Sequence, residues 1–168
     1  DEELEPEEIA EIAAGIEPTD GIFYPGIVQM NYMTGELIKS YGNAPKMIIA
    51  MFDMGGSINT VEFHSEYHGH EDSPKELLEA IDKLDVDFSP RQIAHVATLS
   101  ALANQKLVPK PHLEEIIKYS ATLGALGVNV AHSGTMVGVL FAPDESMKHV
   151  MEAVEKIREK FPELEYFE

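Results

Sequence analysis

The feature that most constrains the fold is a pair of apolar runs at residues 126–141 with a tight turn between them. The first run ends at residues 132–135, where the sequence reads His-Ser-Gly-Thr, and the second continues to Phe141. This pattern predicts two strands joined by a turn. Glycine and small hydroxyl residues leave backbone N–H groups uncovered, so the turn can approach an anion such as phosphate. An ordinary hairpin turn explains the same residues equally well.

Apolar periodicity and turn residues place the other elements. We expect a helix at 6–16, a hairpin from 22 to 41 with Gly35 in its turn, a buried strand at 46–53 and a final strand at 164–167. Prolines and glycines predict helices at about 74–84, 90–105, 111–123 and 143–160. From residue 46 the order predicts an α+β fold, in which a small antiparallel sheet carries helices packed on one face in a split βαβ arrangement.

The composition narrows the possible partners and compartments. Thirty Asp and Glu residues against twelve Lys and Arg give a net charge of −18, which argues against nucleic-acid and anionic-membrane binding. The same charge repels a free nucleotide, so a phosphate ligand needs a divalent cation or a local positive pocket. The chain has no cysteine, no apolar run of membrane-spanning length and an acidic start unlike a secretory signal, so we expect a cytoplasmic protein. A homo-oligomer stays possible.

Two polar clusters are candidates for chemistry. The turn at residues 17–21 places Glu17, Thr19 and Asp20 after a helix, where the helix dipole disfavours a carboxylate. A catalytic or substrate-contacting acid is one explanation, and the turn preference of Asp-Gly is the commoner one. The second cluster holds His64, His68 and His70 beside two acids, which is enough imidazole and carboxylate for a transition metal. Their spacing matches no established site, so we expect a solvated polar segment and assign no metal, with metal binding as the alternative.

Four segments together resemble a known family over essentially the whole chain. They are residues 17–21, Phe-Asp-x-Gly-Gly at 52–56, Ala-Thr-Leu-Ser-Ala-Leu-Ala-Asn-Gln at 97–105 and Gly-Val-Asn-Val-Ala-His-Ser-Gly-Thr at 127–135. In this order they resemble the GHMP small-molecule kinases, and within them the L-threonine kinases of cobalamin biosynthesis. The resemblance implies transfer of the γ-phosphoryl group from ATP, with Mg²⁺, to the hydroxyl of L-threonine. It also implies that residues 45–168 form the C-terminal domain of the GHMP kinases and that residues 1–42, a helix and a hairpin, remain from the N-terminal domain.

The resemblance also implies roles for particular residues. It implies that Asp20 is the acid near the substrate hydroxyl, where it accepts or orients the proton of that group. The expected substrate-binding residues are Glu17, Thr19, Asp53, Gly55, Gly56, His132, Ser133, Gly134 and Thr135. The Gly/Ser-rich phosphate loop of these kinases has no match in the 168 residues. We therefore expect a missing N-terminal segment as a partner, which makes most of the contacts to ATP and Mg²⁺. Without that segment we expect this chain to be inactive. The alternative is a non-catalytic module that binds an amino acid or assists assembly.

Overall fold

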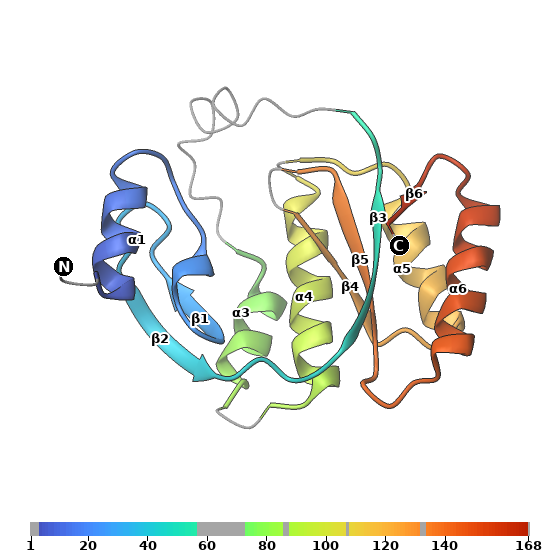
Figure 1. The fold of residues 1–168 in the computed structure, drawn as a ribbon, viewed down its shortest axis with the longest axis horizontal. Helices are drawn as coiled ribbons and strands as arrows, with labels where there is room; N and C mark the ends of the chain where they lie inside the picture. Colours follow the sequence, from blue (N-terminus) through green and yellow to red (C-terminus); the bar gives the residue numbers. More distant parts are fainter. Residues whose placement is uncertain (1–3, 57–72, 86–87, 107, 132–133, 168) are drawn as a thin grey trace. The chain divides into compact units, whose positions relative to one another are not determined.

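The computed structural model describes residues 4–56, 73–85, 88–106, 108–131 and 134–167 (Figure 1). The chain divides into two compact units. The first unit comprises Asp1–Pro45 and Leu84–Phe88, and the second comprises Lys46–Lys83 and Ser89–Glu168. Within the described residues, no helix is long and apolar enough to cross a membrane.

The first unit contains a helix, a short 3-10 turn and a two-stranded antiparallel ribbon. These are α1 (Pro6–Ala14), η1 (Gly21–Phe23), β1 (Ile27–Met30) and β2 (Leu37–Gly42). The predicted hairpin is confirmed, and Gly35 lies in its turn with φ of 77°. A Cβ atom on Gly35 would stand 2.5 Å from the carbonyl oxygen of Ala10, so only glycine lets the ribbon approach α1 this closely.

The second unit contains a four-stranded antiparallel sheet in the order β4-β5-β3-β6. Its strands are β3 (Ile48–Asp53), β4 (Gly127–Val130), β5 (Met136–Phe141) and β6 (Glu165–Tyr166), and its helices are α3 (Lys75–Asp82), α4 (Pro90–Asn104), α5 (Leu113–Thr122) and α6 (Met147–Lys160). The predicted α+β fold with a ferredoxin-like split βαβ order is confirmed. Helix α6 begins four residues after Pro143, because the Ser146 side chain accepts a hydrogen bond from the backbone N–H of His149 and caps the helix there.

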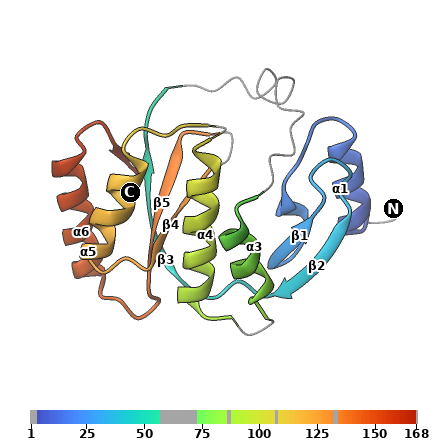
Figure 2. The same cartoon turned by 180° about the vertical axis from the view of Figure 1, so that it is seen from behind.

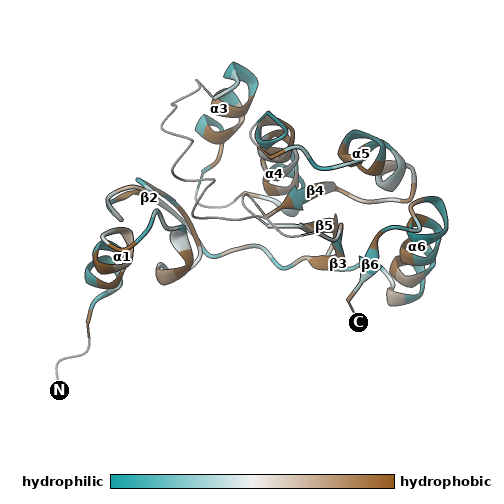
Figure 3. Cartoon of the chain, turned by 90° about the horizontal axis from the view of Figure 1, so that it is seen from above, coloured by the Kyte–Doolittle hydropathy of each residue, from teal (hydrophilic) through white to brown (hydrophobic). Residues whose placement is uncertain are grey.

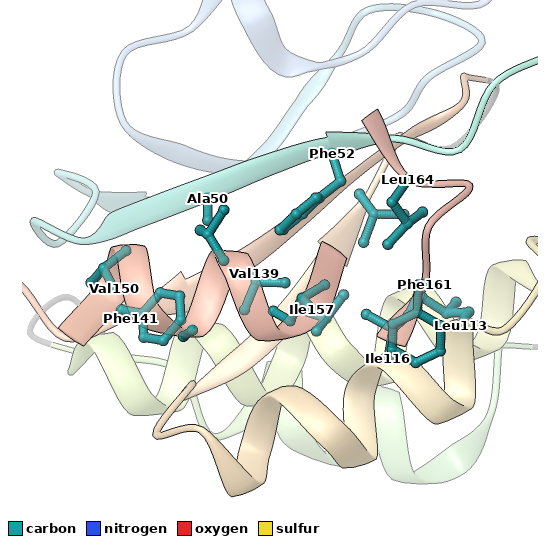
Figure 4. Close-up of a cluster of buried hydrophobic side chains, with 14 of the residues drawn as sticks. Ala50, Phe52, Leu113, Ile116, Val139, Phe141, Val150, Ile157, Phe161 and Leu164 are labelled. Atoms are coloured by element: carbon teal, nitrogen blue, oxygen red, sulfur yellow. The ribbon is translucent and has the colours of Figure 1, made fainter. Parts of the chain in front are cut away.

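One face of this sheet carries the hydrophobic core. Phe52 on β3 lies opposite Val137 on β5, and Ala50 lies opposite Val139. Their side chains pack with α5 and α6 (Figure 4), and in Figure 3 both helices show hydrophobic and hydrophilic residues on different sides. The labelled core residues are Ala50, Phe52, Leu113, Ile116, Val139, Phe141, Val150, Ile157, Phe161 and Leu164.

The predicted buried strand at 46–53 is β3, and the structure buries one of its faces, with Ala50 and Phe52 at 2% and 0% exposure. Ile49 and Met51 point to the face opposite the core and are 50% and 48% exposed. A continuous apolar run is typical of a strand covered on both sides. Among the described residues of this unit, the helices pack on the core face, and Ile49 and Met51 on the second face are half exposed.

Helix α4 runs beside the outer edge of the sheet. The backbone N–H of Val128, on the edge strand β4, donates a 2.9 Å hydrogen bond to the hydroxyl of Thr98 on α4. A Cβ atom on Gly127 would collide with the carbonyl oxygen of Ala94, so glycine permits this close approach. Figures 1 and 2 show α4 beside β4 from opposite sides, and in both views α4 ends at the end of the sheet where β4 ends and β5 begins.

Candidate functional site

The acidic turn of the first unit, residues 17–21, presents an exposed carboxylate. The backbone N–H of Thr19 donates a 3.0 Å hydrogen bond to the carbonyl of Tyr32, which ties the turn to the ribbon. Asp20 precedes η1, and its carboxylate accepts one long hydrogen bond of 3.3 Å from the N–H of Ile22. Turn capping therefore explains part of the role of Asp20. The remaining acceptor positions of this exposed side chain are available to a ligand.

The second unit brings three of the predicted site residues together at the end of β3. One carboxylate oxygen of Asp53 accepts a 2.9 Å hydrogen bond from the N–H of Gly55. The hydroxyl of Thr135, at the start of β5, donates to the same carboxylate. The N–H of Met54 donates a 3.1 Å hydrogen bond to the carbonyl of Thr135, which holds the two segments in register. We call residues 53–56 with 134 and 135 the Asp53 turn.

Hydrogen bonds keep Asp53 ionised. The Thr135 hydroxyl, followed by the N–H of Gly55, lowers the pKa of the Asp53 carboxyl below its ordinary value of 3.8, while burial opposes this. The N–H of Met54 lowers it further. At neutral pH the Asp53 turn therefore carries a fixed negative charge, which suits a cationic group such as an ammonium.

The glycines of the Asp53 turn leave open backbone. Gly55 has φ of 71° and Gly56 has φ of 87°, a region that L residues rarely adopt. Among the residues that the structure describes, no heavy atom lies within 4 Å of the position where a Cβ atom would stand on either residue. These glycines therefore serve the backbone conformation and do not make room for a neighbouring element. Open backbone beside a carboxylate can admit a small polar ligand.

Two predicted site residues lie outside the described residues. They are His132 and Ser133, whose proposed substrate contacts stay predictions. The histidines His64, His68 and His70, expected in a solvated polar segment, also lie outside the described residues. Within the part of the chain that the structure describes, no group of three His, Cys, Asp or Glu side chains could hold a metal ion.

The C-terminal end of α4 reaches the level of the Asp53 turn. Thr98 contacts Val128, and the six helical residues from Thr98 to Asn104 rise about 9 Å. The three strand residues from Val128 to Ala131 rise about 10 Å. The end of α4 and the end of β4 are therefore level, as Figure 1 shows. Asn104, at this end, is 5% exposed.

A lysine that the sequence reasoning missed lies in the loop that follows α4. Lys110 is 5% exposed, although both neighbouring prolines are exposed. The side-chain amide of Gln105 accepts a 2.6 Å hydrogen bond from the N–H of Lys110 and donates a 3.1 Å hydrogen bond to its carbonyl. The sequence Pro-Lys-Pro at 109–111 signals a stiff loop. It does not reveal that the lysine side chain turns inward.

The N-termini of α1, α4, α5 and α6 do not form a phosphate cradle. Helix α1 is capped by the carboxylate of Glu8, which accepts from the N–H of Glu5, and the side chains of Ser89 and Ser146 cap α4 and α6. The first turn of α5 carries Glu114 and Glu115, which repel an anion. These four helix N-termini therefore do not offer free backbone N–H groups to the triphosphate of a nucleotide, and no phosphate contact is assigned to them.

Comparison with known proteins adds both sequence and structural relatives. The family model described as GHMP kinases C terminal matches residues 77–160, which is half of the 168-residue chain. An L-threonine kinase of Citrobacter freundii is 24% identical over 143 residues, which cover 82% of this chain and 50% of that protein. An L-threonine kinase of Salmonella typhimurium is 22% identical over 137 residues, which cover 79% of this chain and 46% of that protein. The chain thus spans about half the length of these curated relatives.

Solved structures with a similar fold are mevalonate kinases. The structure of L. major mevalonate kinase in complex with R-mevalonate matches 97% of this chain and 58% of that one, with a TM-score of 0.65 and 16% identity. The Methanococcus jannaschii mevalonate kinase matches 98% of this chain and 56% of that one, with a TM-score of 0.61 and 17% identity. At such low identity the likeness establishes the fold alone.

Proposed function

Because this chain belongs to the GHMP kinase family, we propose that it is part of an ATP-dependent kinase that phosphorylates the hydroxyl group of L-threonine. The observation that carries the proposal is that two curated relatives, both L-threonine kinases, match 82% and 79% of the chain. The cobalamin pathway, which the sequence resemblance implies, is the proposed use of the product. The expectation of a kinase domain of this family is confirmed, whereas the substrate remains our proposal.

We also propose a division of labour between this chain and a phosphate-binding segment outside its 168 residues. Residues 45–168 would form the C-terminal domain and residues 1–42 part of the N-terminal one. The capped helix ends of the described part and the half-length match to the relatives support this division. ATP and Mg²⁺ would be held mainly by the outside segment and would supply the phosphoryl group.

Two carboxylates have different proposed roles toward the amino acid. Asp20 accepts the proton of the substrate hydroxyl, which its exposed carboxylate with a single long hydrogen bond allows. Asp53 pairs with the substrate ammonium, which its ionised and firmly held carboxylate favours. The remaining proposed contacts, beside these two acids, are Glu17, Thr19, Gly55, Gly56, His132, Ser133, Gly134 and Thr135.

A kinase assay tests the proposal. The full-length protein is mixed with ATP, Mg²⁺ and L-threonine, and release of ADP is followed, with L-serine and L-homoserine as comparison substrates. We expect turnover with L-threonine. These substrates differ by a methyl or a methylene, so selectivity among them should be modest, on the order of 10- to 200-fold. Absence of turnover with all three amino acids contradicts the proposal.

The capped helix ends favour one second candidate, a module that binds an amino acid without catalysis. Calorimetry of the full-length protein separates the two candidates. Binding of L-threonine with no binding of nucleotide supports the module. Binding of both ligands supports the kinase.

A further inference from the structure

Lys110 is buried where a charged side chain is costly. Its side chain is turned inward from a loop whose neighbouring residues Pro109, Pro111 and His112 are exposed. Its ammonium nitrogen is buried and has no hydrogen-bond partner among the residues that the structure describes. An ammonium group removed from water without a counterion loses its solvation and gains nothing in return. A buried polar group without a partner calls for an explanation, and an anionic ligand that pairs with the ammonium is one.

The backbone around Lys110 is held firmly, while the side chain keeps its rotatable stem. Both backbone polar groups of Lys110 bond to the amide of Gln105, at 2.6 and 3.1 Å. Prolines on both sides restrict the backbone further. His112, two residues later, adopts a left-handed conformation with φ of 57°, which is uncommon for a residue other than glycine. The loop thus positions the stem of Lys110, and the flexible four-carbon chain can bring the ammonium to a ligand.

The acidic groups of the neighbouring described segments do not neutralise Lys110. Glu115 and Glu163 lie within 3.3 and 3.7 Å of the ring nitrogens of His112, and Glu114 pairs with Lys118. Burial lowers the pKa of Lys110 below its ordinary value of 10.5, and no charged neighbour contributes to this shift. An anionic ligand that paired with the ammonium would reverse it.

We propose that Lys110 binds the carboxylate group of the amino acid substrate. This inference rests on the proposed function, because it names a further contact for the same ligand. The loop that holds Lys110 is tied to the end of α4, which is level with the Asp53 turn. Asp53 supplies a fixed negative charge at this end of the sheet, and Lys110 supplies a cation that has no partner in the described protein.

The net charge of the chain favours an amino acid over a free anion. At −18, the protein repels a small molecule that carries only negative charge. A zwitterion has no net charge, and it requires one acidic and one basic contact. A buried lysine is well suited to the basic contact, because an ion pair is stronger where water is excluded. Asp53 and Lys110 provide this complementary pair.

Ligand binding without turnover provides the primary test. Calorimetry measures the affinity of the full-length protein for L-threonine and for L-threonine amide, which lacks the negative charge. We expect the wild-type protein to bind L-threonine about 10- to 100-fold more tightly than the amide. Lys110→Met keeps the length of the stem and removes the charge, so it should abolish this preference. Lys118→Met, an exposed lysine on α5, is the matched control and should keep it.

A second readout checks the burial argument. Lys110→Met removes an unpaired buried charge, so the melting temperature of the ligand-free protein should rise while the affinity for L-threonine falls. A lower melting temperature would show that Lys110 has a structural partner and would overturn the proposal.

The outcomes also separate this inference from the proposed function. A preference for L-threonine over its amide that persists in Lys110→Met overturns the role of Lys110, as does a wild-type protein without that preference or without L-threonine binding. If Lys110→Met turns over L-threonine with an unchanged KM, the proposed kinase function stands and the proposed role of Lys110 is wrong. If the preference for L-threonine over its amide depends on Lys110 but the protein has no kinase activity, the role of Lys110 stands and the proposed kinase function is wrong.

Discussion

The two acidic turns of this protein hold their carboxylates in opposite ways. Asp20, in the first unit, is exposed and accepts one hydrogen bond of 3.3 Å. Asp53, in the second unit, accepts a 2.9 Å hydrogen bond from Gly55 and another from the hydroxyl of Thr135, which lower its pKa. A carboxylate that accepts one long hydrogen bond leaves most of its acceptor positions to a ligand, whereas donors that favour the ionised form, as at Asp53, make protonation less favourable and still leave room for a cation. The same residue type therefore suits proton transfer in one turn and electrostatic binding in the other.

The two units also differ in how well they bury their apolar side chains. Asp53 ends a strand whose inner face belongs to the core, where Phe52 and Val137 are fully buried. The first unit leaves large apolar side chains uncovered, with Ile16, Ile22 and Ile38 at 82%, 75% and 58% exposure. The packed sheet thus positions Asp53, while local backbone contacts position Asp20. Changes to the core and changes to the backbone should therefore affect the two turns differently.

The largest expected effect comes from Asp20→Asn. Asparagine still accepts the hydrogen bond from Ile22, so the turn should keep its stability, but it cannot take a proton. We expect turnover of L-threonine to fall about 10²- to 10⁴-fold with little change in melting temperature. ADP release and thermal unfolding measure the two quantities. Glu36→Gln, which removes an exposed carboxylate from the same unit, is the control and should stay active. An active Asp20→Asn variant would remove Asp20 from the role of base.

The next largest effect tests the core that supports Asp53. Phe52→Ala should lower the free energy of unfolding by about 3–5 kcal/mol, because it leaves a cavity beneath the sheet. Ile49→Ala, on the opposite face of the same strand and 50% exposed, should lower it by about 1 kcal/mol or less. Urea-induced unfolding compares the two variants. Equal losses would show that both faces of β3 are covered in solution.

Sequence patterns predicted where the helices and strands of both units lie. They predicted less well which side chains are buried and which residues they contact. The apolar runs located β3 and β5 because strands in a sheet need β-branched and aromatic side chains. They could not show that Ile49 is half exposed, since what covers a face depends on segments distant in the sequence. Resemblance predicted roles for Asp20 and Asp53, which stay predictions, but the hydrogen bond from Thr135 to Asp53 depends on strand pairing across 82 residues. The burial of the Lys110 side chain has no counterpart in the periodicity of the sequence, so the sequence did not predict it.

Two glycines with positive φ angles, Gly35 in the hairpin of the first unit and Gly55 after β3 in the second, allow a further comparison of the two units. Gly35→Ala brings a Cβ atom to 2.5 Å from the backbone of Ala10, so it adds a collision to the conformational cost. We expect it to destabilise the first unit by about 2–4 kcal/mol. Gly55→Ala meets no atom within 4 Å and should cost only the conformational term, about 1–2 kcal/mol. Hydrogen exchange, which reports local opening, should show loss of protection near α1 only for the Gly35 variant. Loss of protection there in both variants would contradict the separation of the units.

The smallest effect is the pH dependence of stability that Asp53 supplies. Its pKa is lowered in the folded state, so the ionised carboxylate stabilises the fold above the ordinary value of 3.8. This contribution is lost as the pH falls through 3.8 and then through the lower pKa of the folded protein. Asp53→Asn should therefore be less stable than the wild type at pH 6, and the difference should narrow as the pH falls below about 4. Thr135→Val, which removes the principal donor, should show the same trend more weakly. Urea-induced unfolding between pH 6 and pH 2.5 measures it, and a difference that stays constant over this range would show that the charge of Asp53 does not stabilise the fold.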